Sequence, residues 1–136
     1  MKLAAILKTG AAVIVISLAA LLALQFIASE RVEVVELETT SASGEAKITR
    51  LWVVDEGGFQ YLRAGGDSGW YQRLLEQPQV RVSRNGNWQA YEAREIIGMG
   101  PQINQLMNDK YTWGDDLIGM MINRADAKAI RLIPRE

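Results

Sequence analysis

The sequence predicts a mainly β domain with short helices (α+β), built as a six-stranded antiparallel barrel and preceded by one N-terminal transmembrane helix. Two observations predict the barrel. Six short runs alternate apolar with polar residues or are rich in β-branched and aromatic residues, and most are joined by hairpin turns. A small antiparallel sheet of this kind leaves no exposed edge when it closes on itself. The apolar character of the first 28 residues predicts the helix.

The N-terminal segment is expected to be a membrane anchor over residues 1–29, with residues 9–28 inside the membrane. Lys2 and Lys8 precede or begin the apolar run and several glutamates follow it, so the positive-inside rule places the N-terminus in the cytoplasm. The protein is then a single-pass protein of the inner (cytoplasmic) membrane, with residues 30–136 as a domain on its extracytoplasmic (periplasmic) side. A secretory signal is the alternative, but the small-residue cleavage sites on offer, Gln25-Phe26-Ile27 and Ile27-Ala28-Ser29, match poorly.

The first two strands are expected at residues 32–39 and 47–54. In the first, valine and glutamate alternate until Val34 and Val35 break the phase, which indicates a bulge or an exposed sheet edge. In the second, apolar side chains alternate between the two faces, so both faces are expected to be covered. One face carries Ile48, Trp52 and Val54, and the other Leu51 and Val53.

Residues 51–78 carry most of the functional signal, because a hairpin, a glycine-rich loop and a helix start follow one another without interruption. The turn at residues 55–58 joins strands at 51–54 and 59–63, and the loop runs from Gly65 to Gly69. Beyond the loop, Trp70 and Leu74 stand four apart, as do Tyr71 and Leu75. This spacing predicts a short helix with Asp67 or Ser68 as its N-cap and an end before Pro78.

This arrangement is typical of an anion site. Unpaired N–H groups at the helix start, glycines that allow close approach and Arg63 at the end of the preceding strand would suit a ligand phosphate. The alternative is that the glycines only turn the chain and that Arg63 is a solvated charge. The spacing alone does not decide between these two interpretations.

A second hairpin and a closing strand are expected after Pro78. Residues 80–83 and 88–94 alternate, and the Asn85-Gly86 pair between them is a strong hairpin signal. Residues 127–133 have the composition of a final strand that ends at Pro134.

Two packing helices are expected before the last strand. Pro101 opens a helix over residues 101–110, and the Trp113-Gly114-Asp115 segment caps a second one. The apolar face of the first consists of Ile103, Leu106 and Met107, and that of the second of Leu117, Met120 and Met121.

The composition excludes several classes of chemistry. The 136 residues include neither cysteine nor histidine. Disulfides, thiolate nucleophiles, Ser-His-Asp machinery and the usual zinc sites are therefore excluded, and we predict no metal site. An enzyme with this composition would depend on a bound cofactor for its chemistry. With 15 basic and 16 acidic residues and no basic run, nucleic acid is not an expected partner.

Several motifs resemble the split-barrel flavin and deazaflavin proteins related to pyridoxamine phosphate oxidase, in particular the deazaflavin-dependent nitroreductase and quinone-reductase branch. The resemblance covers nearly all of residues 47–134. It is carried by Gly65-Gly66, by Gly69-Trp70-Tyr71 with Leu74, Leu75, Pro78, Val80 and Val82, and more loosely by Lys110-Tyr111, Trp113, Asp115 and Ile130-Arg131-Leu132.

The resemblance implies a split barrel that pairs as a homodimer and binds FMN or a deazaflavin. It implies cofactor-phosphate contacts for Arg63, Gly65, Gly66, Ser68 and Gly69. Trp70 and Tyr71 would wall the cofactor pocket and Tyr111 and Trp113 the substrate pocket, although aromatic residues on short helices are more often part of a core.

Two functions follow as hypotheses. The first is a membrane-anchored flavin- or deazaflavin-binding oxidoreductase that reduces a quinone or a nitro compound, a small-molecule ligand that the anchor would bring close. The second is a non-catalytic split-barrel binding or structural module of the cell envelope. No residue of the sequence identifies a catalytic group.

Overall fold

The computed structural model describes residues 2–30, 33–119 and 123–136. The chain divides into two compact units, Met1–Glu33 and Val34–Glu136, each of which is described by itself.

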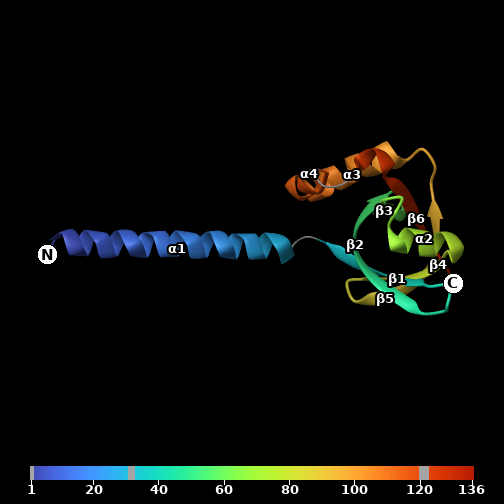
Figure 1. Ribbon diagram of the computed structural model, residues 1–136, viewed down its shortest axis with the longest axis horizontal. Coiled ribbons are helices and arrows are strands. Elements are labelled where there is room, and N and C mark those ends of the chain that lie inside the picture. Colours follow the sequence, from blue (N-terminus) through green and yellow to red (C-terminus); the bar gives the residue numbers. More distant parts are fainter. Residues whose placement is uncertain (1, 31–32, 120–122) are drawn as a thin grey trace. The chain divides into compact units, whose positions relative to one another are not determined.

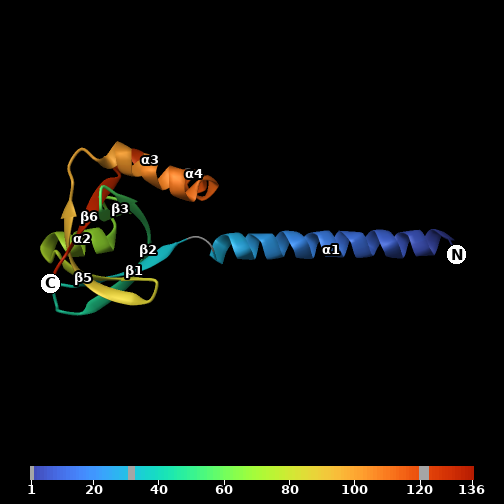
Figure 2. The same ribbon diagram turned by 180° about the vertical axis from the view of Figure 1, so that it is seen from behind.

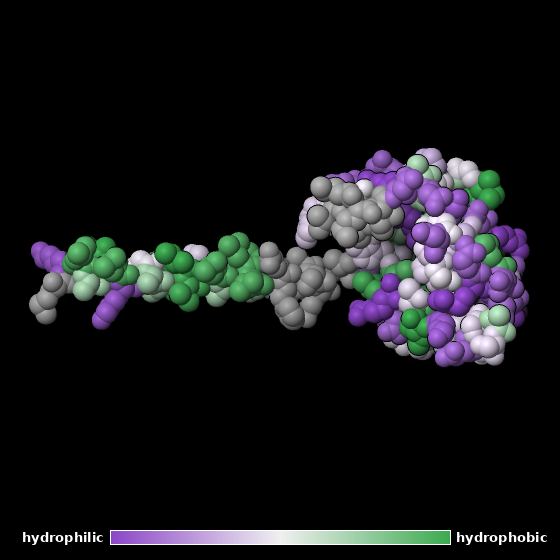
Figure 3. Space-filling model, viewed as in Figure 1, coloured by the Kyte–Doolittle hydropathy of each residue, from purple (hydrophilic) through white to green (hydrophobic). Residues whose placement is uncertain are grey.

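The first unit is the single helix α1 (Lys2–Glu30). Its segment Lys2–Leu24 is 23 residues long with a mean hydropathy of 2.2, which is enough to cross a membrane and also typical of a signal sequence. None of its side chains is buried, and Figure 3 shows apolar residues over most of this segment. The apolar N-terminal helix is thus confirmed, whereas insertion in a membrane and the orientation there stay predictions.

The second unit is a closed barrel of six antiparallel strands, as predicted (Figure 1). The strands follow the order β1-β2-β3-β6-β5-β4 around the barrel. Their bounds are β1 (Val34–Thr40), β2 (Ala46–Glu56), β3 (Phe59–Ala64), β4 (Gln79–Arg84), β5 (Asn87–Glu95) and β6 (Lys128–Pro134).

Both predicted hairpin turns are present. Gly57 and Gly58 have φ of 58° and 85°, and Asn85 and Gly86 have φ of 55° and 79°. Two successive positive φ values match the right-handed twist of the flanking strands, and they are readily adopted by glycine and asparagine. These turns fix the registers of β2 with β3 and of β4 with β5.

The exposed edge that the phase break at Val34-Val35 suggested is absent from the described strands. β1 pairs with β2 on one side and with β4 on the other, and Val35 and Leu37 point into the barrel with no exposed surface. The start of the expected strand, Val32, lies outside the described residues. Closure of the barrel satisfies both edges of β1.

Three helices accompany the barrel, at the places predicted. They are α2 (Gly69–Glu76) between β3 and β4, and α3 (Gly100–Tyr111) and α4 (Trp113–Gly119) between β5 and β6. A short 3-10 helix, η1 (Arg124–Asp126), precedes β6. Figure 2 shows α3 and α4 from behind, on the same side of the barrel as β3.

Two apolar cores hold these elements. The barrel interior includes Val53 of β2 together with Trp70, Tyr71 and Leu74 of α2, and the partly buried Leu51 packs against this core. The outer core, beneath α3, contains Val54, Ile103 and Met107, with Trp52 and Leu106 packed against it.

Two side chains differ from expectation. Ile48 is 57% exposed, because it lies toward the Ala46 end of β2, away from the residues that α3 contacts. Leu75 is 53% exposed and lies off the buried face of α2. Of the second predicted helix, Met120 and Met121 lie outside the described residues, and nothing is described of the Leu117 side chain.

Candidate functional site

A cavity of about 390 Å³ lies beside the barrel strands β2 and β3, and we call it the arginine cavity. This volume falls within the range of roughly 300–1,000 Å³ in which small ligands usually bind. Three arginines and no carboxylate line it among the described residues. The lining residues are Val34, Arg50, Leu51, Trp52, Arg63, Ala64, Gly65, Asn104, Met107, Asn123, Arg124 and Ala127.

Arg63 and Arg124 are held by one buried carboxylate. Asp115, in the first turn of α4, has no exposed surface and pairs with Arg63 through Oδ1 and with Arg124 through Oδ2, the latter at 3.0 Å. The Asp115 carbonyl also accepts a hydrogen bond from Arg124. A carboxylate buried this completely needs charged partners to offset the cost of leaving water. Asp115 therefore joins β3, α4 and η1 at one side of the cavity.

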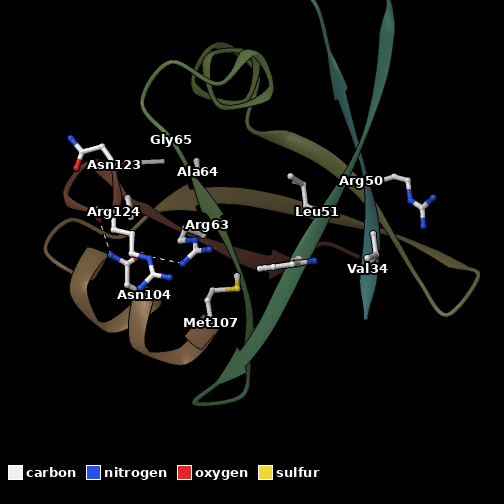
Figure 4. Close-up of a pocket in the computed structure, with 12 residues that line it drawn as sticks. Val34, Arg50, Leu51, Arg63, Ala64, Gly65, Asn104, Met107, Asn123 and Arg124 are labelled. Carbon is white, nitrogen blue, oxygen red and sulfur yellow. Dashed lines mark hydrogen bonds between the residues drawn. The ribbon is translucent and has the colours of Figure 1, made fainter. Parts of the chain in front are cut away.

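Asn104 of α3 links Arg63 and Arg124 through hydrogen bonds. Its Oδ1 accepts a hydrogen bond from Arg63 Nη1 at 3.2 Å, and its Nδ2 donates to the Arg124 carbonyl at 2.9 Å. Figure 4 shows Arg63, Asn104 and Arg124 together on one side of the cavity, whereas Arg50 lies on the far side and points away from them. Arg63 uses two of its five N–H groups on Asn104 and Asp115, so others remain for a ligand.

Apolar side chains form the remaining wall. Leu51 and Met107 contribute aliphatic surface, and the Trp52 ring lies flat against that of Tyr111, with centroids 4.2 Å apart and planes 8° from parallel. Tyr111 is thus one layer behind the cavity. An apolar wall facing fixed guanidinium groups suits a planar ligand that carries an anionic group.

The glycine-rich loop binds a carboxylate from another part of the chain, that of Asp126 in η1. The Gly66 N–H donates to Asp126 Oδ2 at 3.0 Å, and a Cβ at position 66 would lie 2.7 Å from the same oxygen. Because glycine has no Cβ, the Asp126 carboxylate can approach the backbone at position 66 in this way. The loop is also tied internally, since Gln72 donates to the Gly66 carbonyl at 2.7 Å.

The predicted cofactor residues are divided among three places. Arg63 and Gly65 line the arginine cavity. Gly66 and Ser68 line a separate hollow over the loop, while Gly69 begins α2 with its Cα facing the Arg73 side chain. Ser68 occupies the N-cap position, although its side chain makes no capping hydrogen bond.

The four predicted aromatic residues lie outside the arginine cavity. Trp70 and Tyr71 belong to the barrel interior, at 7% and 8% exposure. The Tyr71 hydroxyl donates to the Glu95 carboxylate, and this hydrogen bond, together with burial, raises the pKa of Tyr71 to about 12. Tyr111 is buried behind Trp52, whereas Trp113 is 71% exposed. The pocket roles of these four residues stay predictions.

Several residues of the site were not singled out by local sequence signals. Asn104, Arg124 and Asp126 occur in polar stretches without a motif, and Asp115 is indicated by the sequence only as part of a helix cap and of the family resemblance. Their partners lie 41 to 60 residues away in the sequence for the contacts Arg63–Asn104, Arg63–Asp115 and Gly66–Asp126. Only the closed barrel brings them together.

Solved structures resemble this chain over most of its length. No protein-family model matches the sequence, and comparison with curated proteins found no match. The heme storage protein HutZ from Vibrio cholerae is 14% identical over 80% of this chain and 86% of its own, with a TM-score of 0.60. A candidate pyridoxamine 5'-phosphate oxidase from Listeria innocua is 11% identical over 83% and 91%, with a TM-score of 0.60.

The chain has the split-barrel fold. An F420-H2-dependent reductase, FDR-A, is 24% identical to this split barrel over 72% of the chain and 92% of its own, with a TM-score of 0.56. A further structure, described as a domain-swapped dimer, is 24% identical over 72% and 78%, with a TM-score of 0.57. The resemblance of the predicted fold to this group is confirmed.

Proposed function

We propose that the split barrel binds a flavin or deazaflavin in the arginine cavity and acts as a reductase. The observation that carries the proposal is the combination, in one cavity of about 390 Å³, of an apolar wall with the fixed guanidinium groups of Arg63 and Arg124. Reductases dependent on F420-H2 share the fold, which supports the proposal.

The residues of this chain fit such a cofactor in part. Leu51, Trp52 and Met107 offer surface for a planar ring system, and Arg63 and Gly65 are the predicted residues that this placement uses. The remaining N–H groups of Arg63 would hold an anionic group of the cofactor. The bound cofactor would supply hydride chemistry, and the chain would bind and orient it.

The electron acceptor that we propose is a quinone or a nitro compound. An uncleaved α1 would keep the domain beside the membrane, where lipid-soluble quinones are concentrated. This part of the proposal depends on retention of the N-terminal anchor.

The anchor is tested by location. Protease added to spheroplasts should digest residues 30–136, and the protein should stay with the membrane fraction in high salt. A domain that resists protease, or a mature N-terminus near residue 29, would contradict the anchored and extracytoplasmic topology.

A non-catalytic binding module is the second candidate, and one observation favours it. Asp126 accepts a hydrogen bond from the Gly66 N–H that a cofactor phosphate was expected to use, so a phosphate there would have to displace this carboxylate. The fold is also shared with a heme storage protein.

Turnover separates the two candidates. The full chain in detergent would be mixed anaerobically with chemically reduced FMN or reduced deazaflavin, and a soluble quinone or a nitroaromatic compound would then be added. The reductase proposal predicts reduction of the acceptor faster than in the mixture without protein, with a rate that saturates with cofactor. Cofactor binding without acceleration would favour the binding module, and no binding would reject the proposal.

A further inference from the structure

The hollow over the glycine-rich loop differs in charge from the arginine cavity beside it. We call it the loop hollow, and it is lined by residues 65–68 and by Asn123, Ala125 and Asp126. Two carboxylates, those of Asp67 and Asp126, and no cationic side chain line it among the described residues. It shares Gly65 and Asn123 with the arginine cavity, so the two spaces adjoin.

Asp126 occupies two groups near the loop that would otherwise attract phosphate, the Gly66 N–H and the Lys128 ammonium group. Its Oδ2 accepts the Gly66 N–H at 3.0 Å, and its Oδ1 lies 3.4 Å from Lys128 Nζ. A backbone N–H and an ammonium group arranged around two oxygens form a typical phosphate contact. The carboxylate therefore stands where phosphate oxygens would be held.

A phosphate entering the loop hollow would meet a second negative charge at the same donors. Displacing Asp126 would cost its hydrogen bond and its ion pair, and leaving it in place would bring two anions into contact. Arg63 and Arg124 in the adjoining cavity offer the opposite charge, with N–H groups of Arg63 still available.

We propose that Asp126 is a specificity-determining residue that excludes phosphate from the glycine-rich loop and directs the anionic group of the ligand to Arg63 and Arg124. This inference rests on the proposed binding of a flavin-like ligand in the arginine cavity. It differs from the phosphate site expected from the sequence, in which Arg63 and the glycine-rich loop held the phosphate together.

The first test compares FMN with riboflavin, which lacks the phosphate, in equilibrium titrations of the full chain in detergent. Asp126→Ala frees the Gly66 N–H and Lys128, so affinity for FMN relative to riboflavin should rise on the order of tenfold. The Asp126 side chain is 51% exposed, so this variant is expected to fold. The matched control Asp67→Asn removes a charge from the same hollow but frees no donor, and should change the ratio by less than about twofold. An unchanged ratio in Asp126→Ala would overturn the inference.

The second test does not depend on flavin binding. The backbone amide resonance of Gly66 would be followed by NMR during titration with inorganic phosphate. The inference predicts a shift in Asp126→Ala and none in the wild type. Equal responses in the two proteins, including no response in either, would overturn it. If neither flavin binds any variant, the proposed function fails, and the phosphate titration alone decides the role of Asp126.

Discussion

At the scale of single residues, Asp115 stands out as a carboxylate without exposed surface. Its carboxylate is fully buried and is shared by Arg63, whose side chain is 14% exposed, and Arg124. Charged partners from two other elements, β3 and η1, converge on this one charge, so the network depends on it. Removing one member of a buried ion pair is costly because its partners stay charged and lose their counterion.

We expect Asp115→Asn to lower the free energy of unfolding by about 3 kcal/mol or more, because Arg63 loses its carboxylate partner and Arg124 keeps only the exposed Asp116, at 3.8 Å. Urea denaturation of the full chain, followed by tryptophan fluorescence, measures this. Asp55→Asn is the matched control, since Asp55 pairs with Arg84 at 2.8 Å but is 57% exposed. Its cost should stay below about 1 kcal/mol. Equal costs for the two variants would show that the buried network does not stabilise the domain.

Tyr71 gives the domain a dependence on alkaline pH. The Glu95 carboxylate accepts a hydrogen bond from the Tyr71 hydroxyl, so the folded state favours the neutral phenol and the pKa of Tyr71 rises from 10.0 to about 12. An unfolded chain releases this proton near pH 10, so the stability from the pair is complete below pH 10 and is lost as pH approaches about 12.

Tyr71→Phe isolates this effect. The wild type should lose unfolding free energy relative to Tyr71→Phe between pH 10 and about 12. Denaturant titrations of both proteins across this range measure the difference, which cancels the titration of other groups. Parallel pH profiles would mean that the Tyr71–Glu95 hydrogen bond is not maintained in solution.

At the scale of elements, α3 supplies hydrogen-bond partners to β2 next to the residue at which the pairing of β1 with β2 begins. The pairing of β1 with β2 starts at Val34 and Trp52, and the next residue of β2, Val53, instead exchanges hydrogen bonds with Tyr111. The Tyr111 hydroxyl lies 3.0 Å from both the N–H and the carbonyl oxygen of Val53. The same ring supports Trp52 in the cavity wall.

Tyr111→Phe should therefore act mainly on stability. Loss of the hydroxyl leaves a buried backbone N–H without this partner, and we expect a cost of about 1–3 kcal/mol. Trp113→Ala, at a residue that is 71% exposed, should change the unfolding free energy by less than about 0.5 kcal/mol. Thermal unfolding followed by circular dichroism compares the two. A larger effect at Trp113 would mean that its ring is covered in solution.

The elements were predictable because their signals are local. Gly57-Gly58 and Asn85-Gly86 identified the two hairpins, since few other residues adopt two positive φ values in succession. The site was less predictable. Arg63 and Gly65 were found from the strand-loop-helix pattern, but Asp115 and Asp126 contact them or their neighbours across 52 and 60 residues of sequence. The Gly66 N–H of the loop donates to the Asp126 carboxylate, and the binding of a cofactor phosphate at the loop stays a prediction.

At the scale of the whole molecule, we predict a homodimer, which the resemblance to the split-barrel flavin and deazaflavin proteins implies. A strand face that carries Trp52 or Trp88 is a candidate contact surface of the dimer. Trp52 lies between the cavity and Tyr111, which leaves Trp88, with Arg81 5.2 Å above its ring. Light scattering of the full chain, corrected for bound detergent, should give the mass of two chains at tens of micromolar, and the mass of one chain would contradict the dimer.

A binding titration of two cavity variants tests the proposal that the arginine cavity holds the cofactor. Leu51→Trp places an indole in the cavity, whereas Ile48→Trp adds the same ring to an exposed position of the same strand. Calorimetric titration of the full chain with FMN and with deazaflavin should give the wild-type Kd for Ile48→Trp and a Kd at least about tenfold weaker for Leu51→Trp. Wild-type affinity in Leu51→Trp would contradict binding in the arginine cavity, because the cofactor would then bind elsewhere.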